Sequence, residues 1–71
     1  MQTITAYSKR QEETFVAELT RDLKPTKILR YLSMDGKMAC YDPLEVESMD
    51  NVPTDAREDF EHQLKKLRNL N

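Results

Sequence analysis

The stretch PTKILRYLSMDGKMACYDPLE, residues 25–45, decides between two folds for this 71-residue chain. It contains the chain's one glycine, Gly36, and the dipeptide Asp35-Gly36 is a strong hairpin signal where alternating apolar residues flank it. Here four apolar residues follow the spacing of a helix instead: Ile28, Leu29, Tyr31 and Leu32. We therefore predict a helix over 25–34 that begins at Pro25 and stops at Gly36. A β-hairpin over 27–41 is the alternative.

The preceding segment also has a helical pattern. Ser8 followed by Gln11 is a capping-box spacing. Apolar residues then recur on one face of a helix, at Phe15, Val16, Leu19 and Leu23. Pro25 ends the pattern, because the residue before a proline avoids the helical region. This predicts a helix over 8–23, preceded by a tail or short arm over 1–7.

Two further helices are predicted in the second half. Asp42, Pro43 and Glu45 form a helix-start pattern, which predicts a short helix over 43–49. The turn residues 50–53 follow, and Thr54 is the expected cap of a last helix over 55–69. That helix has one apolar stripe with spacings of three and four residues: Ala56, Phe60, Leu64, Leu67 and Leu70.

Together these elements predict a mainly α fold, with three to four helices over about 8–23, 25–34, 43–49 and 55–69. The order is similar to a winged-helix or helix-turn-helix core, with a short extended piece near 37–41. The alternative is an α+β fold with helix–β-hairpin–helix around Asp35-Gly36. Seventy-one residues form one domain at most, so we expect a single domain over 1–71. Since only 38% of the residues are hydrophobic, a homodimer or a bound partner would add stability.

Residues with catalytic or metal-binding chemistry are sparse. The chain has one cysteine, Cys40, and one histidine, His62, and it has no glycine-rich phosphate loop. We therefore expect no enzyme activity, no cofactor and no metal. A lone cysteine favours a reducing cytoplasm, and there is no apolar run of about 18 residues to span a membrane.

The distribution of charge suggests the first hypothesis for function. Between residues 38 and 61 one basic residue, Arg57, faces eight acids: Asp42, Glu45, Glu47, Asp50, Asp55, Glu58, Asp59 and Glu61. Such a surface would steer a basic partner. The first hypothesis is therefore a small regulatory protein that binds a basic protein, with Tyr41 and Met49 as apolar anchors. An inhibitor of the kind found in phages or mobile elements fits this description.

The alternative hypothesis is a helix-turn-helix regulator that binds DNA. Binding to DNA depends on basic residues that displace counterions from phosphates. One group of basic residues lies in the first half of the chain, at Arg21, Lys24, Lys27, Arg30 and Lys37. A second group ends the last predicted helix, at Lys65, Lys66 and Arg68.

Overall fold

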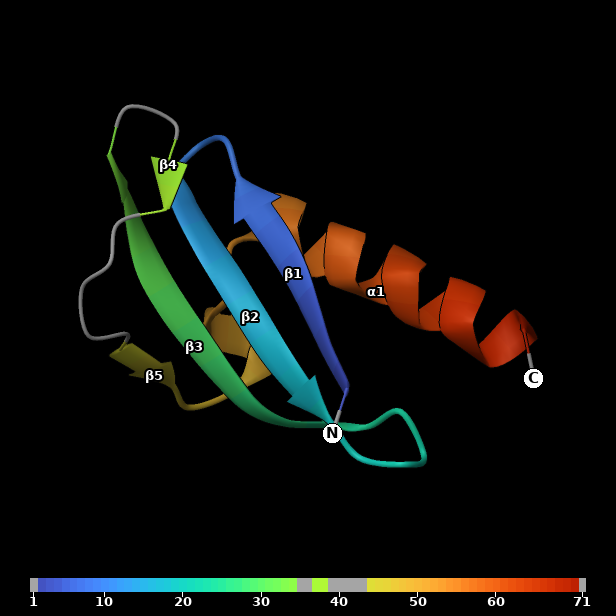
Figure 1. Cartoon of the computed structure of the whole chain (residues 1–71). Helices are drawn as coiled ribbons and strands as arrows, with labels where there is room; N and C mark the ends of the chain where they lie inside the picture. The colour runs from blue at the N-terminus through green and yellow to red at the C-terminus, as the bar shows by residue number, and fades with distance from the viewer. Residues whose placement is uncertain (1, 35–36, 39–43, 71) are drawn as a thin grey trace.

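A computed structural model describes residues 2–34, 37–38 and 44–70, and it contains an antiparallel β-sheet with one α-helix packed behind it (Figure 1). The strands in chain order are β1 (Gln2–Ser8), β2 (Glu13–Leu19), β3 (Pro25–Met34), β4 (Lys37–Met38) and β5 (Leu44–Val46). A short 3-10 helix, η1 (Met49–Asn51), then leads into the helix α1 (Thr54–Asn69).

The three long strands form a meander, and the two short strands share one edge of it. β1 pairs with β2 along its whole length, and β2 pairs with β3. On its other side β3 pairs with β5 over 28–30 and with β4 over 33–34. In the part of the chain that the structure describes, no strand pairs with the outer edge of β1.

The mainly α prediction is wrong, because α1 is the one α-helix among the described residues. The predicted helix 8–23 instead contains strand β2, and the predicted helix 25–34 is strand β3. The predicted helix 43–49 contains β5 and the first residue of η1. The tail or arm expected over 1–7 is largely strand β1. The last helix is confirmed, and it begins one residue earlier than expected.

Strand β2 shows why the helical spacing misled. Phe15 and Leu19 are four residues apart, so they share a face both in a helix and in a strand. The strand also places Ala17 on this face, where its exposed fraction is 0%, and it places Val16 on the opposite face. Ala17 is too small to stand out as a core residue in the sequence. β3 has the same ambiguity, since Ile28 is buried while Leu29 lies on the other face.

The alternative of helix–β-hairpin–helix is also wrong, because its first helix is absent. Its antiparallel pairing does have a counterpart, since Met34 in β3 lies opposite Lys37 in β4. The dipeptide Asp35-Gly36 and the rest of the predicted extended piece, 39–41, lie outside the described residues.

The Ser8–Gln11 pattern forms one of the two hydrogen bonds of a capping box, although it forms it in the turn between two strands and not at the start of a helix. The backbone N–H of Gln11 donates to Ser8 Oγ at 3.2 Å. This contact lies in the connection between β1 and β2, where Glu12 has a φ of 53°. A serine side-chain oxygen can therefore accept a hydrogen bond from the N–H three residues later both at the start of a helix and in a turn between strands. The Ser8–Gln11 pattern alone does not distinguish these two structures.

The core lies between α1 and one face of the sheet, which we call the inner face. The helix contributes Ala56, Phe60 and Leu64, and it packs chiefly against β1. Val52, between η1 and α1, closes one end. The strands and the β2–β3 turn contribute the remaining buried apolar residues: Ile4, Ala6, Phe15, Ala17, Leu19, Leu23 and Ile28.

Phe60 is the largest fully buried side chain of α1, with an exposed fraction of 0%. Replacing a fully buried phenylalanine with alanine costs about 3–5 kcal/mol. We therefore expect Phe60→Ala to unfold at a much lower urea concentration than the parent chain, as measured by circular dichroism. Leu70→Ala is the matched control, because Leu70 is 80% exposed and surface changes stay within about 0.5 kcal/mol. Equal midpoints for the two variants would contradict this packing.

Candidate functional site

The face of the sheet turned away from α1, here called the open face, is covered by no helix or strand among the described residues (Figure 1). Its side chains lie in cross-strand rows that the pairing registers define. One row contains Thr5, Val16 and Leu29, and the next contains Tyr7, Thr14 and Tyr31. Side chains directly opposite each other on paired strands are in contact distance. The two rows therefore form one continuous uncharged patch.

This patch is partly apolar and accessible. Tyr7 is 40% exposed, and Val16, Leu29 and Tyr31 are half-buried. Charges lie only around it: Glu18 and Lys27 form the next row beyond Thr5, and Glu45 extends the Thr5 row at the β5 edge. Tyrosine is enriched in protein interfaces, because it buries a large area and keeps a polar tip. The open face thus has the composition of an interaction surface.

The acidic residues of the first hypothesis do not gather on one face. Glu45 lies on the open face, whereas Glu58, Asp59 and Glu61 are exposed on α1, behind the sheet. Glu47 is exposed between β5 and η1. Asp50, in η1, lies 3.9 Å from Arg57 in an exposed ion pair. Asp42 and the predicted anchor Tyr41 lie outside the described residues.

Asp55 has a structural role at the start of α1. Its Oδ2 accepts hydrogen bonds from Ser8 Oγ at 3.2 Å and from the Arg10 backbone N–H at 3.3 Å. Burial of the carboxyl opposes ionisation, but the bonds from Ser8 and from backbone N–H groups outweigh it and hold the pKa of Asp55 below its ordinary value. Asp55 therefore connects the β1–β2 turn to the helix.

Arg68 of the second basic group contacts the β2–β3 turn, which carries two residues of the first group, Arg21 and Lys24. The guanidinium of Arg68 donates to the backbone oxygen of Leu23 at 3.3 Å, so this side chain connects the last turn of α1 to the β2–β3 turn. Arg21 and Lys24 are exposed in that turn, and Lys65 is exposed on α1. Leu23 has a φ of 61°, a conformation that costs a branched residue roughly 1–2 kcal/mol, and its buried side chain offsets this.

The other basic candidates lie elsewhere. Lys27 is exposed on the open face of β3. Arg30 is on the inner side, with its Nε 3.9 Å from Glu13 Oε2. Neither of these two atoms has a hydrogen-bond partner among the described residues. Lys37 belongs to β4.

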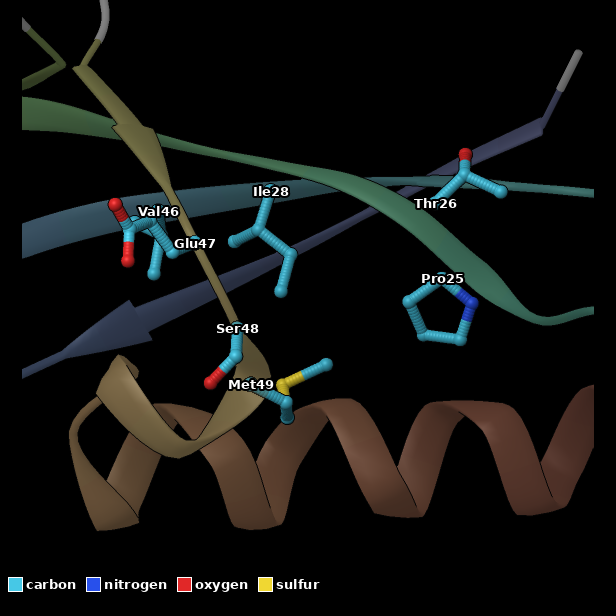
Figure 2. A pocket seen from close by; sticks show the side chains of 7 residues that line it. All are labelled: Pro25, Thr26, Ile28, Val46, Glu47, Ser48 and Met49. Carbon is cyan, nitrogen blue, oxygen red and sulfur yellow. The ribbon is translucent and has the colours of Figure 1, made fainter.

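Met49, the second predicted anchor, lies at the margin of the core. It is half-buried and packs against the core cluster. Figure 2 shows its side chain in a hollow between the start of β3 and the segment from β5 to η1, close to Ile28 and Pro25. The hollow has a volume of 260 Å³, and Glu47 and Ser48 form its polar side. Since Ile28 is buried and Met49 is half-buried, the apolar side of the hollow continues the core.

The described residues contain no group of three or more histidine, cysteine, aspartate or glutamate side chains placed to hold a metal ion. His62 is exposed on α1, and Cys40 lies outside the described range. Within that range no helix has both the length and the apolar character needed to cross a membrane.

Comparison with protein-family models, with curated proteins and with solved structures found no match to this chain. The evidence for the candidate surface therefore comes from the fold of this chain and not from a related protein. The helical interpretation of the sequence missed Val16 and Leu29 as surface residues, because it placed both on a buried stripe. The alternation in QTITAYS, residues 2–8, was the signal that could have indicated a sheet.

Asp55 makes stability depend on acid pH. A group whose pKa is lowered in the folded state stabilises the fold above its unfolded pKa, here near 3.8, and this contribution disappears as the pH falls through the folded value. We expect Asp55→Asn to be less stable than the parent chain at pH 7, with the difference shrinking below about pH 4. Urea unfolding at several pH values measures it. Asp59→Asn, which removes one negative charge at an exposed position of the same helix, is the matched control.

Proposed function

We propose that this chain is a small non-enzymatic interaction module that binds another protein through the open face of its sheet. The observation that supports the proposal is the uncharged patch formed by the Thr5 and Tyr7 rows. A half-buried valine, leucine and tyrosine on an uncovered sheet face leave apolar area in water, and a partner that covers them would remove that area.

The charges around the patch define the kind of partner. Glu45 borders the patch at the β5 edge, and Lys27 lies beyond it at the other end of β3. A complementary surface would carry an apolar strip with a basic group near Glu45 and an acidic group near Lys27, since rim charges orient a partner more than they strengthen binding. The partner therefore still carries a basic group, as in the first hypothesis, but the interface is an uncharged patch and not an acidic surface. The lone cysteine of the chain is consistent with a cytoplasmic setting, which we include in the proposal.

A second candidate function is binding to a nucleic-acid backbone. The contact between Arg68 and Leu23 favours it, because that contact connects the basic end of α1 to the turn that carries Arg21 and Lys24. The helix-turn-helix form of this idea is not proposed again, since α1 is the one α-helix among the described residues. Backbone binding needs only a cluster of accessible cations.

Photo-cross-linking tests the protein-binding proposal. A photoreactive phenylalanine analogue at Tyr31 should give one reproducible cross-linked protein in the native cell, and adding Val16→Thr and Leu29→Thr should reduce that product about tenfold or more. Threonine keeps the preference for a strand, so the fold should remain.

The matched control places the same analogue at His62, which is exposed on α1 behind the sheet. Substituting Glu58, Asp59 and Glu61 with serine then tests the acidic helix surface. Cross-links that form only from position 62, and disappear with these serines, would overturn the open-face proposal.

A salt titration tests the second candidate. For about four phosphate contacts, affinity for a fluorescent random duplex should fall roughly 100-fold between 50 and 200 mM salt. Arg21→Ser with Lys24→Ser should flatten this slope, whereas Lys9→Ser with Arg10→Ser removes the same charge from the β1–β2 turn and should not. Equal slopes for both pairs would exclude the Arg21–Lys24 end as the site.

A further inference from the structure

The outer edge of β1 is a second surface, separate from the open face. β1 pairs with β2 over seven residues, and no other strand pairs with it among the described residues. The amide nitrogen of the Gln63 side chain donates to the backbone oxygen of Thr5 at 2.8 Å. The backbone of Thr5 therefore points away from β2, and the alternation of a strand gives Thr3 and Tyr7 the same direction.

Helix α1 extends beyond this edge. Figure 1 shows its C-terminal half projecting past β1, on the inner side of the sheet. Below the edge lies a largely apolar groove of 240 Å³, lined by Gln2 and Ile4 of the strand and by Gln63, Lys66, Leu67 and Leu70 of the helix. Leu70 ends the apolar stripe of α1 and is 80% exposed. The helix thus provides an apolar floor where the sheet has no strand.

We propose that the β1 edge and this groove bind an extended peptide segment of another protein, which adds to the sheet as a strand beside β1. The outward backbone groups of Thr3, Thr5 and Tyr7 would pair with the peptide backbone. Alternate side chains of the peptide would point down onto Leu67 and Leu70. The inference goes beyond the proposed function, because it concerns a different surface and an unfolded ligand.

The groove defines the chemistry of the peptide. Its floor requires apolar residues at every second position, and Lys66 at its side favours an acidic residue at one end. Gln63 already donates a hydrogen bond to the Thr5 carbonyl, so it protects the edge. The peptide must displace this side chain when it binds.

A second copy of the chain does not fit this site. Ile4 and Ala6 of β1 are already buried under the chain's own helix. In a two-fold antiparallel pairing of β1 with β1, both helices would lie on the same side of the joined sheet. The helix of the second copy would then need the space that the projecting end of α1 occupies (Figure 1). We therefore infer that the occupant is a strand with no helix packed on the side that faces α1.

The experiment uses the full chain, labelled with 15N and 13C, and an eight-residue peptide in which valine alternates with threonine after two glutamates. At peptide concentrations up to about 1 mM, we expect saturable shifts of the Thr3, Thr5 and Tyr7 amides and of the Leu67 and Leu70 methyl groups. The same peptide with a central proline should not bind, because proline cannot donate to a ladder.

Three variants separate the proposed site from a structural role. Thr5→Pro removes an outward N–H that β2 does not use, and Leu70→Ser removes part of the floor, so each should weaken binding about tenfold. Gln63→Ala should strengthen binding severalfold, because the peptide no longer displaces a side chain. Leu29→Thr, on the open face, is the control and should bind as the parent does.

Three results would overturn the inference: no saturable shift, shifts confined to Leu29 and Tyr31, or self-association of the chain through the amides of β1. Weaker binding by Gln63→Ala, in a variant whose spectrum shows the native fold, would also overturn it. None of these outcomes depends on the cross-link from Tyr31, so failure of this inference and failure of the proposed function are distinguishable.

Discussion

Helix α1 is the one helix that covers the sheet among the described residues, and the other features of the structure depend on this constraint. Its 16 residues span roughly 24 Å, and they pack chiefly against β1. The contacts of Phe60 and Ala56 with the strands exclude water, and both side chains have an exposed fraction of 0%. The sheet surface that this helix does not cover is exposed to solvent or to a partner. The fold therefore has one buried inner face and one open face.

The two candidate surfaces follow from the placement of the helix. Because α1 packs chiefly against β1, its C-terminal half projects past the sheet and takes Leu70 away from the core. On the opposite side, Val16 and Leu29 are half-buried without any helix or strand of the described chain above them. Strand pairing also separates the charges: Glu45 lies on the open face, while Glu58 lies behind the sheet. Asp55, bonded to Ser8, acts within the fold.

The sequence predicted the parts that depend on local periodicity over a long segment. The stripe through Phe60 and Leu64 predicted α1, because few other structures repeat apolar residues at that spacing for four turns. The short segments were ambiguous, since Phe15 and Leu19 fit a helix and a strand equally well. The interaction surface was missed for the same reason: a helical interpretation buried Val16 and Leu29. The positive charge of Arg68 was evident in the sequence, but its contact with Leu23 in the β2–β3 turn was not.

The sequence by itself determined the C-terminal helix, the buried positions of Ala56, Phe60 and Leu64 in its stripe, and the scarcity of catalytic side chains. The tertiary structure alone decided that 13–19 and 25–34 are strands, because strand pairing joins residues far apart in the chain and no local pattern records it. It also decided the function of Gln63 at the β1 edge and of Arg68 beside Leu23. Each of these contacts connects residues more than forty positions apart, and only the packing of the helix on the sheet brings them together.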